Sequence, residues 1–525
     1  MIIQSLCDTD FYKFSMQMVV LHHFPSTDVK YKFVCRTKNI DLRPLKEEIE
    51  EEIDHLCSLK FTKEELNFLS SIRFLKKDYI DFLSDFTLKR KYVEVSNGFD
   101  GLEITISGPW LQCILFEVPI LAIVSEVYCK KQIDINEAYE NLHKNLDKKI
   151  EFYKGLKNKF PFADFGTRRR FSFDVQNGVV RDLKKEMPDT FTGSSNCYLC
   201  LTQDLVPIGT MAHEFISAGM GLGEVQLVKS QKYMLEKWAE EYRGDLGIAL
   251  TDTINMDSFL IDFDLFLASL FSGCRQDSGD PYIWCEKLIA HYKKIRIDPL
   301  TKTAVFSDAL DFEKASKIYD TFKDRIKVSF GIGTFLSNDC NIKPLSMVIK
   351  MTECNGNPVA KISDEPSKSI CKDEEFLSYL KQVFKVPDYG NGKVKEEDIA
   401  KICKPICDEF KIKLTDVTID SDYIKRAGMV GCEESFKNKS YSCCGELILG
   451  NYDNPELKLI SFFHELGHNS LISQESLEDE LISKMDTELE CWRIGIAFAK
   501  KRNITFSEDA VAWGYKQAIT YANYK

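Results

Sequence analysis

Five short polar segments of this sequence carry residues that could do chemistry, and each follows an apolar run. They are rich in glycine, arginine and aspartate, and one contains a histidine: Asp164–Arg170, Gly209–Glu214, Gly273–Asp280, Ser307–Asp308 and Gly331–Thr334. Backbone N–H groups exposed at glycines bind anionic oxygens together with guanidinium groups, whereas aspartates bind Mg²⁺. The combination predicts an enzyme that handles phosphate groups.

The clearest structural unit around these segments is a strand, a helix and a second strand. The predicted strands are Thr303–Phe306 and Ile326–Phe330, and the predicted helix is Phe312–Lys323. A crossover helix of this kind joins parallel strands. An α/β barrel carries its functional groups on the loops after successive parallel strands, so the pattern predicts such a barrel.

Two further patterns indicate where the alternation of strands and helices ends. Leu345–Glu353 and Pro358–Ser363 flank the turn dipeptide Asn355-Gly356, which predicts a β-hairpin. The stretch Pro387–Lys393 is rich in turn residues and is the predicted domain boundary. We therefore expect a β-rich layer after the barrel and a separate domain beyond it.

Composition narrows the class of protein. The chain has 525 residues, more than one ordinary domain, and its apolar fraction of 44% is sufficient for packed cores. The net charge of −12 argues against nucleic acid as a partner, because binding to nucleic acid needs a cationic face. The 18 cysteines are scattered, and we find neither a signal peptide nor an unbroken apolar run of about 18 residues. We expect a cytoplasmic protein with free thiols and no membrane segment.

The polar segments resemble those of nicotinate phosphoribosyltransferases. The resemblance begins at Asp8–Lys13, ends at Ile370-Cys371, and includes Leu250–Thr253, Val305–Asp308 and Glu353–Gly356. It implies the type II phosphoribosyltransferase fold over residues 1–390. In that fold an irregular α/β barrel (about 125–334) lies beside an open-faced β-rich domain (about 1–124 and 335–390). The resemblance also implies a homodimer.

The implied reaction joins nicotinate to phosphoribosyl pyrophosphate, with ATP hydrolysis coupled to it and Mg²⁺ as cofactor. Three side chains would hold nicotinate, with a bidentate ion pair from the arginine: Tyr12, Thr210 and Arg275. Asp277 and Asp308 would contact ribose hydroxyls or Mg²⁺, and Asp277 is a candidate catalytic residue. The backbone of Gly331 and Gly333, together with Thr334, would bind the 5-phosphate.

The resemblance places His213 where the family carries a phosphohistidine. A neutral imidazole is a competent nucleophile toward the γ-phosphate of ATP. Arg168–Arg170 would neutralise phosphates during that step. Ala309 departs from the pattern, since relatives often carry asparagine there.

The alternative substrate is nicotinamide, which would make the chain a nicotinamide phosphoribosyltransferase. A carboxylate beside Arg275 gains a charge-assisted pair that an amide lacks, a difference of about 1.5–3 kcal/mol. Nicotinate is therefore the favoured substrate.

The motif His464-Glu465-Leu466-Gly467-His468 lies outside this resemblance. Asn454 and Pro455 predict the start of a helix before it, and on a helix His464 and His468 share one face. Both imidazoles could then bind Zn²⁺, with Glu465 activating a metal-bound water. The region resembles a zincin-like α+β metallopeptidase domain over residues 395–525.

A third zinc ligand is needed, and two residues compete for the role. Glu488 fits the zincin pattern better than Glu490, because residues two apart on a helix face different directions. Gly445–Leu449 is expected to be the edge strand on which a peptide would lie. The domain could instead bind zinc structurally or bind a partner. A further alternative makes the peptidase the main activity and the first module a metabolite sensor.

Overall fold

The computed structural model describes residues 1–386 except 100, 365–370, 372 and 385. Beyond them it describes residues 403, 406–407, 413–416, 441–443, 446–449, 455–472, 491–496, 499, 506, 510–511 and 514. The chain forms two compact units, Met1–Val386 and Pro387–Lys525.

The first unit contains a five-stranded antiparallel sheet built from segments far apart in the sequence. Its strands, in spatial order, are β11 (Asn357–Pro358), β10 (Met347–Cys354), β1 (Asp28–Cys35), β3 (Leu102–Pro109) and β2 (Val93–Asn97). Asn355 and Gly356 turn between β10 and β11 with positive φ of 49° and 75°, so the predicted hairpin is confirmed.

The second sheet of this unit is parallel and has six strands. In spatial order they are β5 (Phe191–Ser194), β4 (Phe162–Asp164), β9 (Lys327–Ile332), β8 (Thr303–Phe306), β7 (Gly273–Gln276) and β6 (Ile248–Leu250). The segment 207–210 connects its two edges. Ile208 N donates to Ser194 O at 2.9 Å, and Thr210 Oγ1 donates to Ile248 O at 2.8 Å. These two hydrogen bonds attach the edge strands β5 and β6 to the same segment, and this link takes the place of a direct β-ladder between the two strands.

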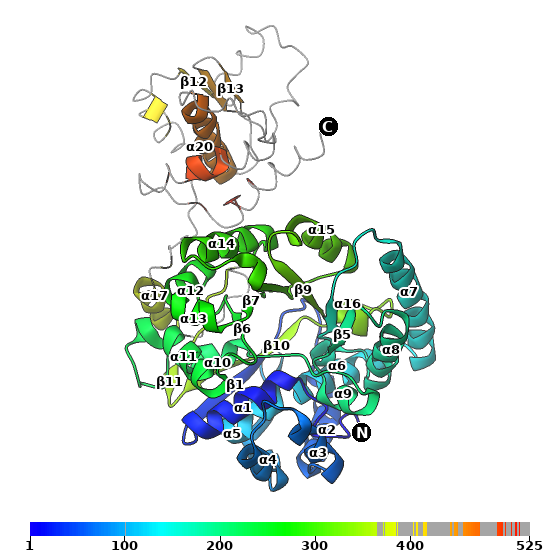
Figure 1. Cartoon of the computed structure of the whole chain (residues 1–525). Helices are drawn as coiled ribbons and strands as arrows, with labels where there is room; N and C mark the ends of the chain where they lie inside the picture. Colours follow the sequence, from blue (N-terminus) through cyan, green and yellow to red (C-terminus); the bar gives the residue numbers. More distant parts are fainter. Residues whose placement is uncertain are drawn as a thin grey trace. The chain divides into compact units, whose positions relative to one another are not determined.

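Helices surround the parallel sheet, and α7, α8, α14 and α15 lie outside its strands (Figure 1). The helices that follow or join the parallel strands are α8 (Phe173–Glu186), α9 (Cys197–Gln203), α10 (His213–Ala218), α11 (Ser230–Tyr242), α12 (Met256–Asp262), α13 (Leu265–Leu270), α14 (Pro281–Lys294), α15 (Phe312–Phe322) and α16 (Thr334–Ser337). The others of this unit are α1 (Phe11–His23), α2 (Lys46–Ser58), α3 (Lys63–Ser71), α4 (Lys77–Ser84), α5 (Trp110–Cys113), α6 (Glu117–Lys130), α7 (Ile135–Gly155) and α17 (Glu374–Val383). The predicted strand at Thr303–Phe306 and the crossover helix after it are confirmed.

One helical stretch among the described residues, Trp110–Lys130, is long and apolar enough to cross a membrane. Its mean hydropathy is 1.7, but 89% of its most apolar window is buried inside the protein. Its apolar side chains therefore have protein neighbours, as in a core helix. Glu117 and Glu126 interrupt the stretch, so the sequence shows no unbroken apolar run there.

The second unit contains a three-stranded sheet and a long helix among its described residues. The strands are β12 (Lys413–Asp416), β14 (Glu446–Leu449) and β13 (Tyr441–Cys443) in spatial order, and the helix is α20 (Pro455–Ile472). The helix begins at Pro455, as predicted. The expectation that Gly445–Leu449 forms an edge strand is wrong, because β14 pairs with β13 on one side and with β12 on the other.

Candidate active site

A cavity of about 750 Å³ lies at the carboxyl ends of the parallel strands. One wall consists of the loops after β4, β7, β8 and β9, and another consists of β10 residues 348–351 and the first turn of α1. Most of the residues predicted from the first module line it: Tyr12, Arg168, His213, Arg275, Asp277, Asp308, Gly333 and Thr334. The structure thus gathers motifs that are up to several hundred residues apart in the sequence.

Thr210 and Gly331 are not among the lining residues. The Thr210 hydroxyl donates to the carbonyl of Ile248 and attaches the segment 207–210 to β6, so it serves the fold. Gly331 is packed under Phe165, and a Cβ at this position would lie 2.3 Å from that ring. The expected contacts of Thr210 with nicotinate and of Gly331 with phosphate therefore have no support in the geometry.

Two buried donors in the cavity point to a bound anion. In the part of the chain that the structure describes, Tyr12 Oη and Arg275 Nε are buried and have no hydrogen-bond partner. Buried polar atoms are almost always hydrogen-bonded, so such atoms in a cavity indicate a missing ligand. Gly209 has a φ of 153°, and a Cβ there would lie 3.2 Å from Tyr12 N. The glycine therefore permits the close approach that places Tyr12.

His213 is the first residue of α10, and Asp252 orients its ring. His213 Nε2 lies 2.9 Å from Asp252 Oδ1, and Asp252 is inaccessible to solvent. Burial and the nearby Lys361 lower the pKa of His213 to about 4. The imidazole is therefore neutral at pH 7. Because the facing carboxylate of Asp252 has a pKa well below its usual range and can only accept, the matching tautomer carries its proton on Nε2 and leaves the lone pair on Nδ1 as a potential nucleophile.

The carboxylates near His213 differ in their capacity to hold Mg²⁺. Potential ligand atoms of His213, Asp252 and Asp277 lie within 4.8 Å of one another. Both oxygens of Asp252 are already hydrogen-bonded, to His213, Lys361 and Ser278, so this aspartate is a poor ligand. Asp277 is 29% exposed and lines the cavity together with Asp308. These two carboxylates fit the oxygen-rich coordination that Mg²⁺ prefers.

Cationic side chains line the cavity beside these carboxylates. Arg168 is 38% exposed, and its guanidinium lies 3.8 Å from Glu117 and 3.9 Å from Asp10. These long contacts leave the side chain able to turn toward a ligand. Burial and the neighbouring Lys361 lower the pKa of Lys350, on β10, to about 8. The cavity therefore offers cationic side chains to more than one anionic group.

A buried ion-pair cluster connects the beginnings of α1 and α10. Lys13 is fully buried and forms ion pairs with Glu117 Oε2, at 2.5 Å, and with Glu214 Oε1. Burial raises the pKa of Glu214, whereas Lys13 and Arg168 overcome burial and lower that of Glu117. The cluster fixes Tyr12 and His213 relative to each other, since each adjoins one of its members.

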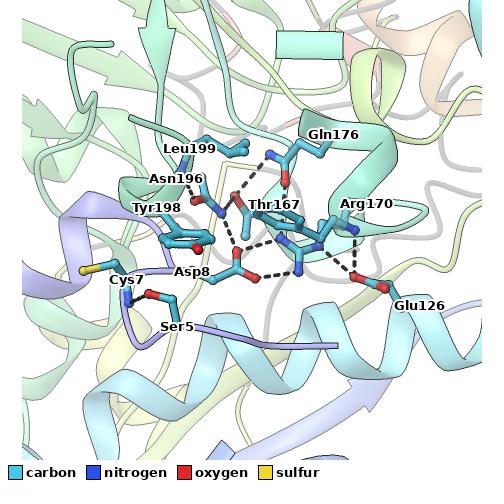
Figure 2. A network of polar contacts seen from close by, with 12 residues as sticks. Ser5, Cys7, Asp8, Glu126, Thr167, Arg170, Gln176, Asn196, Tyr198 and Leu199 are labelled. Atoms are coloured by element: carbon cyan, nitrogen blue, oxygen red, sulfur yellow. Dashed lines mark hydrogen bonds and ion pairs between the residues drawn. The ribbon is translucent and has the colours of Figure 1, made fainter. Parts of the chain in front are cut away.

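Arg170 does not line the cavity, unlike the sequence-based expectation that the whole arginine triplet faces the phosphates. Its side chain is fully buried and forms two bonds of 2.7 Å to the oxygens of Asp8 and one of 3.0 Å to Glu126. Figure 2 shows this network, with Asn196 also donating to Asp8. Only Arg168 and Arg169 of the triplet line the cavity.

The loop after β8 contains a strained position. Ala309 has a φ of 47°, in the left-handed region that asparagine and glycine adopt more readily than alanine. Asparagine, which the family resemblance implies at this position, would adopt this conformation more readily than alanine does.

The predicted zinc residues lie only partly within the described residues. His464 and Glu465 are on α20, and each is 8% exposed. The His464 ring stacks on Trp492 with centroids 4.0 Å apart. The side chains of His468, Glu488 and Glu490 lie outside the described residues.

Several residues in the cavity or directly behind it were not predicted from the sequence. Asp252 follows β6, and its position after a strand is a signal that could have identified it. Glu117, Lys350 and Lys361 come from a core helix and from the hairpin region that follows the parallel sheet in the sequence. No local pattern marks these three, because their approach to the cavity depends on how the two sheets pack.

Comparison with known proteins gives consistent results. Residues 160–388 match the model of the nicotinate phosphoribosyltransferase (NAPRTase) family, and residues 7–125 match that of its N-terminal domain. Nicotinate phosphoribosyltransferase of Burkholderia mallei is 50% identical over 402 residues, which are 75% of this chain and 100% of the relative. That of Chromobacterium violaceum is 50% identical over 395 residues, covering 74% and 98%.

Solved structures agree. The crystal structure of nicotinate phosphoribosyltransferase from Vibrio cholerae has a TM-score of 0.70 and 39% identity, covering 74% of this chain and 95% of that one. The enzyme from Porphyromonas gingivalis has a TM-score of 0.68 and 33% identity, covering 73% and 100%.

The Arg170 network predicts a large loss of stability. Arg170→Met leaves the buried carboxylates of Asp8 and Glu126 without their cation and should cost about 3–5 kcal/mol in the free energy of unfolding. Urea unfolding followed by tryptophan fluorescence measures this. Arg181→Met, at a residue that is 68% exposed, is the control and should change little. A loss below about 1 kcal/mol in Arg170→Met would show that the network is not structural.

The strain at Ala309 predicts an unusual gain in stability. Ala309→Gly should raise the free energy of unfolding by about 1 kcal/mol, because glycine adopts positive φ without a steric penalty. Ala315→Gly, within α15, should instead lower it by at least about 1 kcal/mol. Equal signs for the two substitutions in calorimetric unfolding would contradict the assignment of strain.

Proposed function

We propose that this chain, which belongs to the nicotinate phosphoribosyltransferase family and is an enzyme of that class, joins nicotinate to phosphoribosyl pyrophosphate. The products are nicotinate mononucleotide and pyrophosphate, in the salvage branch of NAD biosynthesis. One observation carries the proposal: Arg275 Nε and Tyr12 Oη are buried, have no hydrogen-bond partner among the described residues, and lie in a cavity with cationic side chains.

Arg275 sets the choice of pyridine. Its guanidinium offers a donor with no partner among the described residues, and nicotinate supplies a carboxylate for it. Nicotinamide would leave the cation facing a neutral amide, at a cost of about 1.5–3 kcal/mol. Arg275 also helps to lower the pKa of Asp277 against the effect of burial, so this carboxylate is ionised next to the reacting sugar.

Phosphoribosyl transfer separates charge. The bond between the anomeric carbon and pyrophosphate breaks as the pyridine nitrogen attacks, so positive charge develops on the sugar and negative charge on the leaving group. Asp277 can stabilise the former, and Arg168 and Lys350 the latter. Mg²⁺, held by Asp277 and Asp308, would neutralise pyrophosphate when bound. Gly333 and Thr334 offer backbone N–H groups to the 5-phosphate.

Coupling to ATP would use His213. The Nδ1 lone pair attacks the γ-phosphorus, the bond to the bridging oxygen breaks, and ADP leaves with that electron pair. Nε2–H stays bonded to Asp252, which stabilises the positive charge of the phosphorylated ring. Water later attacks phosphorus, releases inorganic phosphate and restores the imidazole. We also infer a homodimer and a cytoplasmic location, the latter because the described cysteines are free thiols.

Removal of the Arg275 guanidinium should reduce turnover. For Arg275→Met, kcat/KM for nicotinate should fall about 10- to 150-fold, because the charge-assisted pair is lost. Pyrophosphate release measures this. Any activity with nicotinamide should change much less. Arg325→Met is the control: this exposed residue precedes β9 and so lies near the amino ends of the strands, away from the cavity, and the variant should behave as wild type. Unchanged kcat/KM for nicotinate in Arg275→Met would refute the assignment.

A second function concerns the other unit, which we propose to be a zinc-binding module. The supporting observation is that α20 is continuous from Pro455 to Ile472, so His464 and His468 share one helical face. Glu488, or Glu490, would be the third ligand. Catalysis by Glu465, and hence a peptidase, is a further step that the comparisons do not support.

The metal content of the full-length protein tests this second proposal. Elemental analysis should find about one zinc per chain, and His464→Ala/His468→Ala should remove it, because three protein ligands are the minimum of usual zinc sites. His143→Ala, at a residue that is 51% exposed, is the matched control. Absence of zinc from the wild type would end the proposal. Cleavage of a peptide library with and without chelator tests the peptidase alternative.

A further inference from the structure

Asp252 is held by more groups than orientation of a histidine requires. While Oδ1 faces His213, Oδ2 accepts hydrogen bonds from Ser278 Oγ at 2.5 Å and from Lys361 Nζ at 2.8 Å. Asp252, Ser278 and Lys361 are 0%, 1% and 6% exposed. A carboxylate whose two oxygens are both hydrogen-bonded in this way cannot rotate. Oδ1 is therefore held in one position relative to the imidazole of His213.

The segment that supplies Lys361 is itself fixed to the barrel. Ile362 N donates to Thr253 O at 2.9 Å, and Ser363 Oγ donates to Ser278 Oγ at 2.9 Å. Ser363 has a φ of 72°, a conformation that persists in a non-glycine residue only when the surroundings impose it. The hairpin region after the barrel is thus attached to the loops after β6 and β7 at adjacent points.

We propose that Lys361 and Ser278 are positioning residues that clamp Asp252, fix the tautomer of His213 with its proton on Nε2, and thereby direct phosphorylation to Nδ1. This inference rests on the proposed phosphorylation of His213 by ATP. It gives the chain that follows the antiparallel sheet a specific part in that step. Lys361 comes after β11, whereas His213, Asp252 and Ser278 belong to the part of the chain that forms the parallel sheet and its helices.

The charge of Lys361 supports the same role. Burial would raise the pKa of Asp252, but Lys361 and His213 together lower it well below its usual range. The carboxylate is therefore ionised and acts only as an acceptor, which excludes the arrangement with a bare Nε2 facing a protonated carboxyl. Lys361 also lines the cavity, so a direct contact with a phosphate is the competing explanation of its presence.

The two explanations differ in which imidazole nitrogen they expect to be phosphorylated in variants of Lys361 and Ser278. The full-length enzyme is incubated with ATP, denatured in alkali, and examined by ³¹P NMR, which separates the Nδ1 and Nε2 isomers of phosphohistidine. Wild type should contain the Nδ1 isomer. Ser278→Ala and Lys361→Met should phosphorylate about 10- to 100-fold more slowly, as when an orienting partner behind a reactive group is lost, and should yield the Nε2 isomer in part.

Conservative and distant variants complete the design. Lys361→Arg keeps the charge and a donor and should restore the Nδ1 isomer, whereas Lys327→Met, at an exposed residue of β9, should match wild type. Ser278→Ala removes a single oxygen and does not touch the cavity, so it keeps the test valid if Lys361→Met fails to fold.

The possible outcomes distinguish failure of the proposed clamp from failure of the proposed coupling to ATP. Slow phosphorylation that yields only the Nδ1 isomer in both variants would overturn the clamp and favour direct phosphate contact. Wild-type rate and isomer in Ser278→Ala would also overturn it. Absence of phosphohistidine from the wild type, or labelling that persists in His213→Asn, would instead overturn the proposed coupling to ATP.

Discussion

The shared carboxylate of Asp252 is the interaction on which the rest of the site depends. It is fully buried, and it bonds at once to the helix that begins with His213, to the loop that carries Ser278, and to Lys361 of the returning chain. A buried anion of this kind is stable only when its partners are all present. The parallel and antiparallel sheets therefore have to meet correctly before His213 and Asp252 are held in this arrangement.

The charged side chains that line the cavity are less completely paired than those behind it. Its charges are only partly paired: Arg168 makes long contacts, Arg275 keeps a donor without a partner among the described residues, and Lys350 has a lowered pKa. Fully matched pairs, such as those of Arg170 and Lys13, lie just behind this surface and hold it in place. This difference in pairing distinguishes the residues that can bind a ligand from the residues that hold them in position.

The sequence predicts most of the strand-end chemistry, because polar residues directly after parallel strands must meet at one edge. Asp277, Asp308 and Gly333 follow this rule in that they line the cavity. Arg170 does not, because its side chain pairs with the buried Asp8 and Glu126 instead. Lys361 also escapes it, since the approach of a distant hairpin has no local signal. The second unit shows the limit for the HExxH motif: helix α20 is predicted correctly, but spacing alone fixes neither ligands nor activity.

The most direct test of the account is the protonation state of His213 in the resting enzyme. Long-range ¹⁵N NMR at pH 7, with the resonance assigned by comparison with His213→Asn, reports which ring nitrogen carries hydrogen. The account predicts hydrogen on Nε2 and a bare Nδ1. Hydrogen on Nδ1, or on both nitrogens, would contradict it.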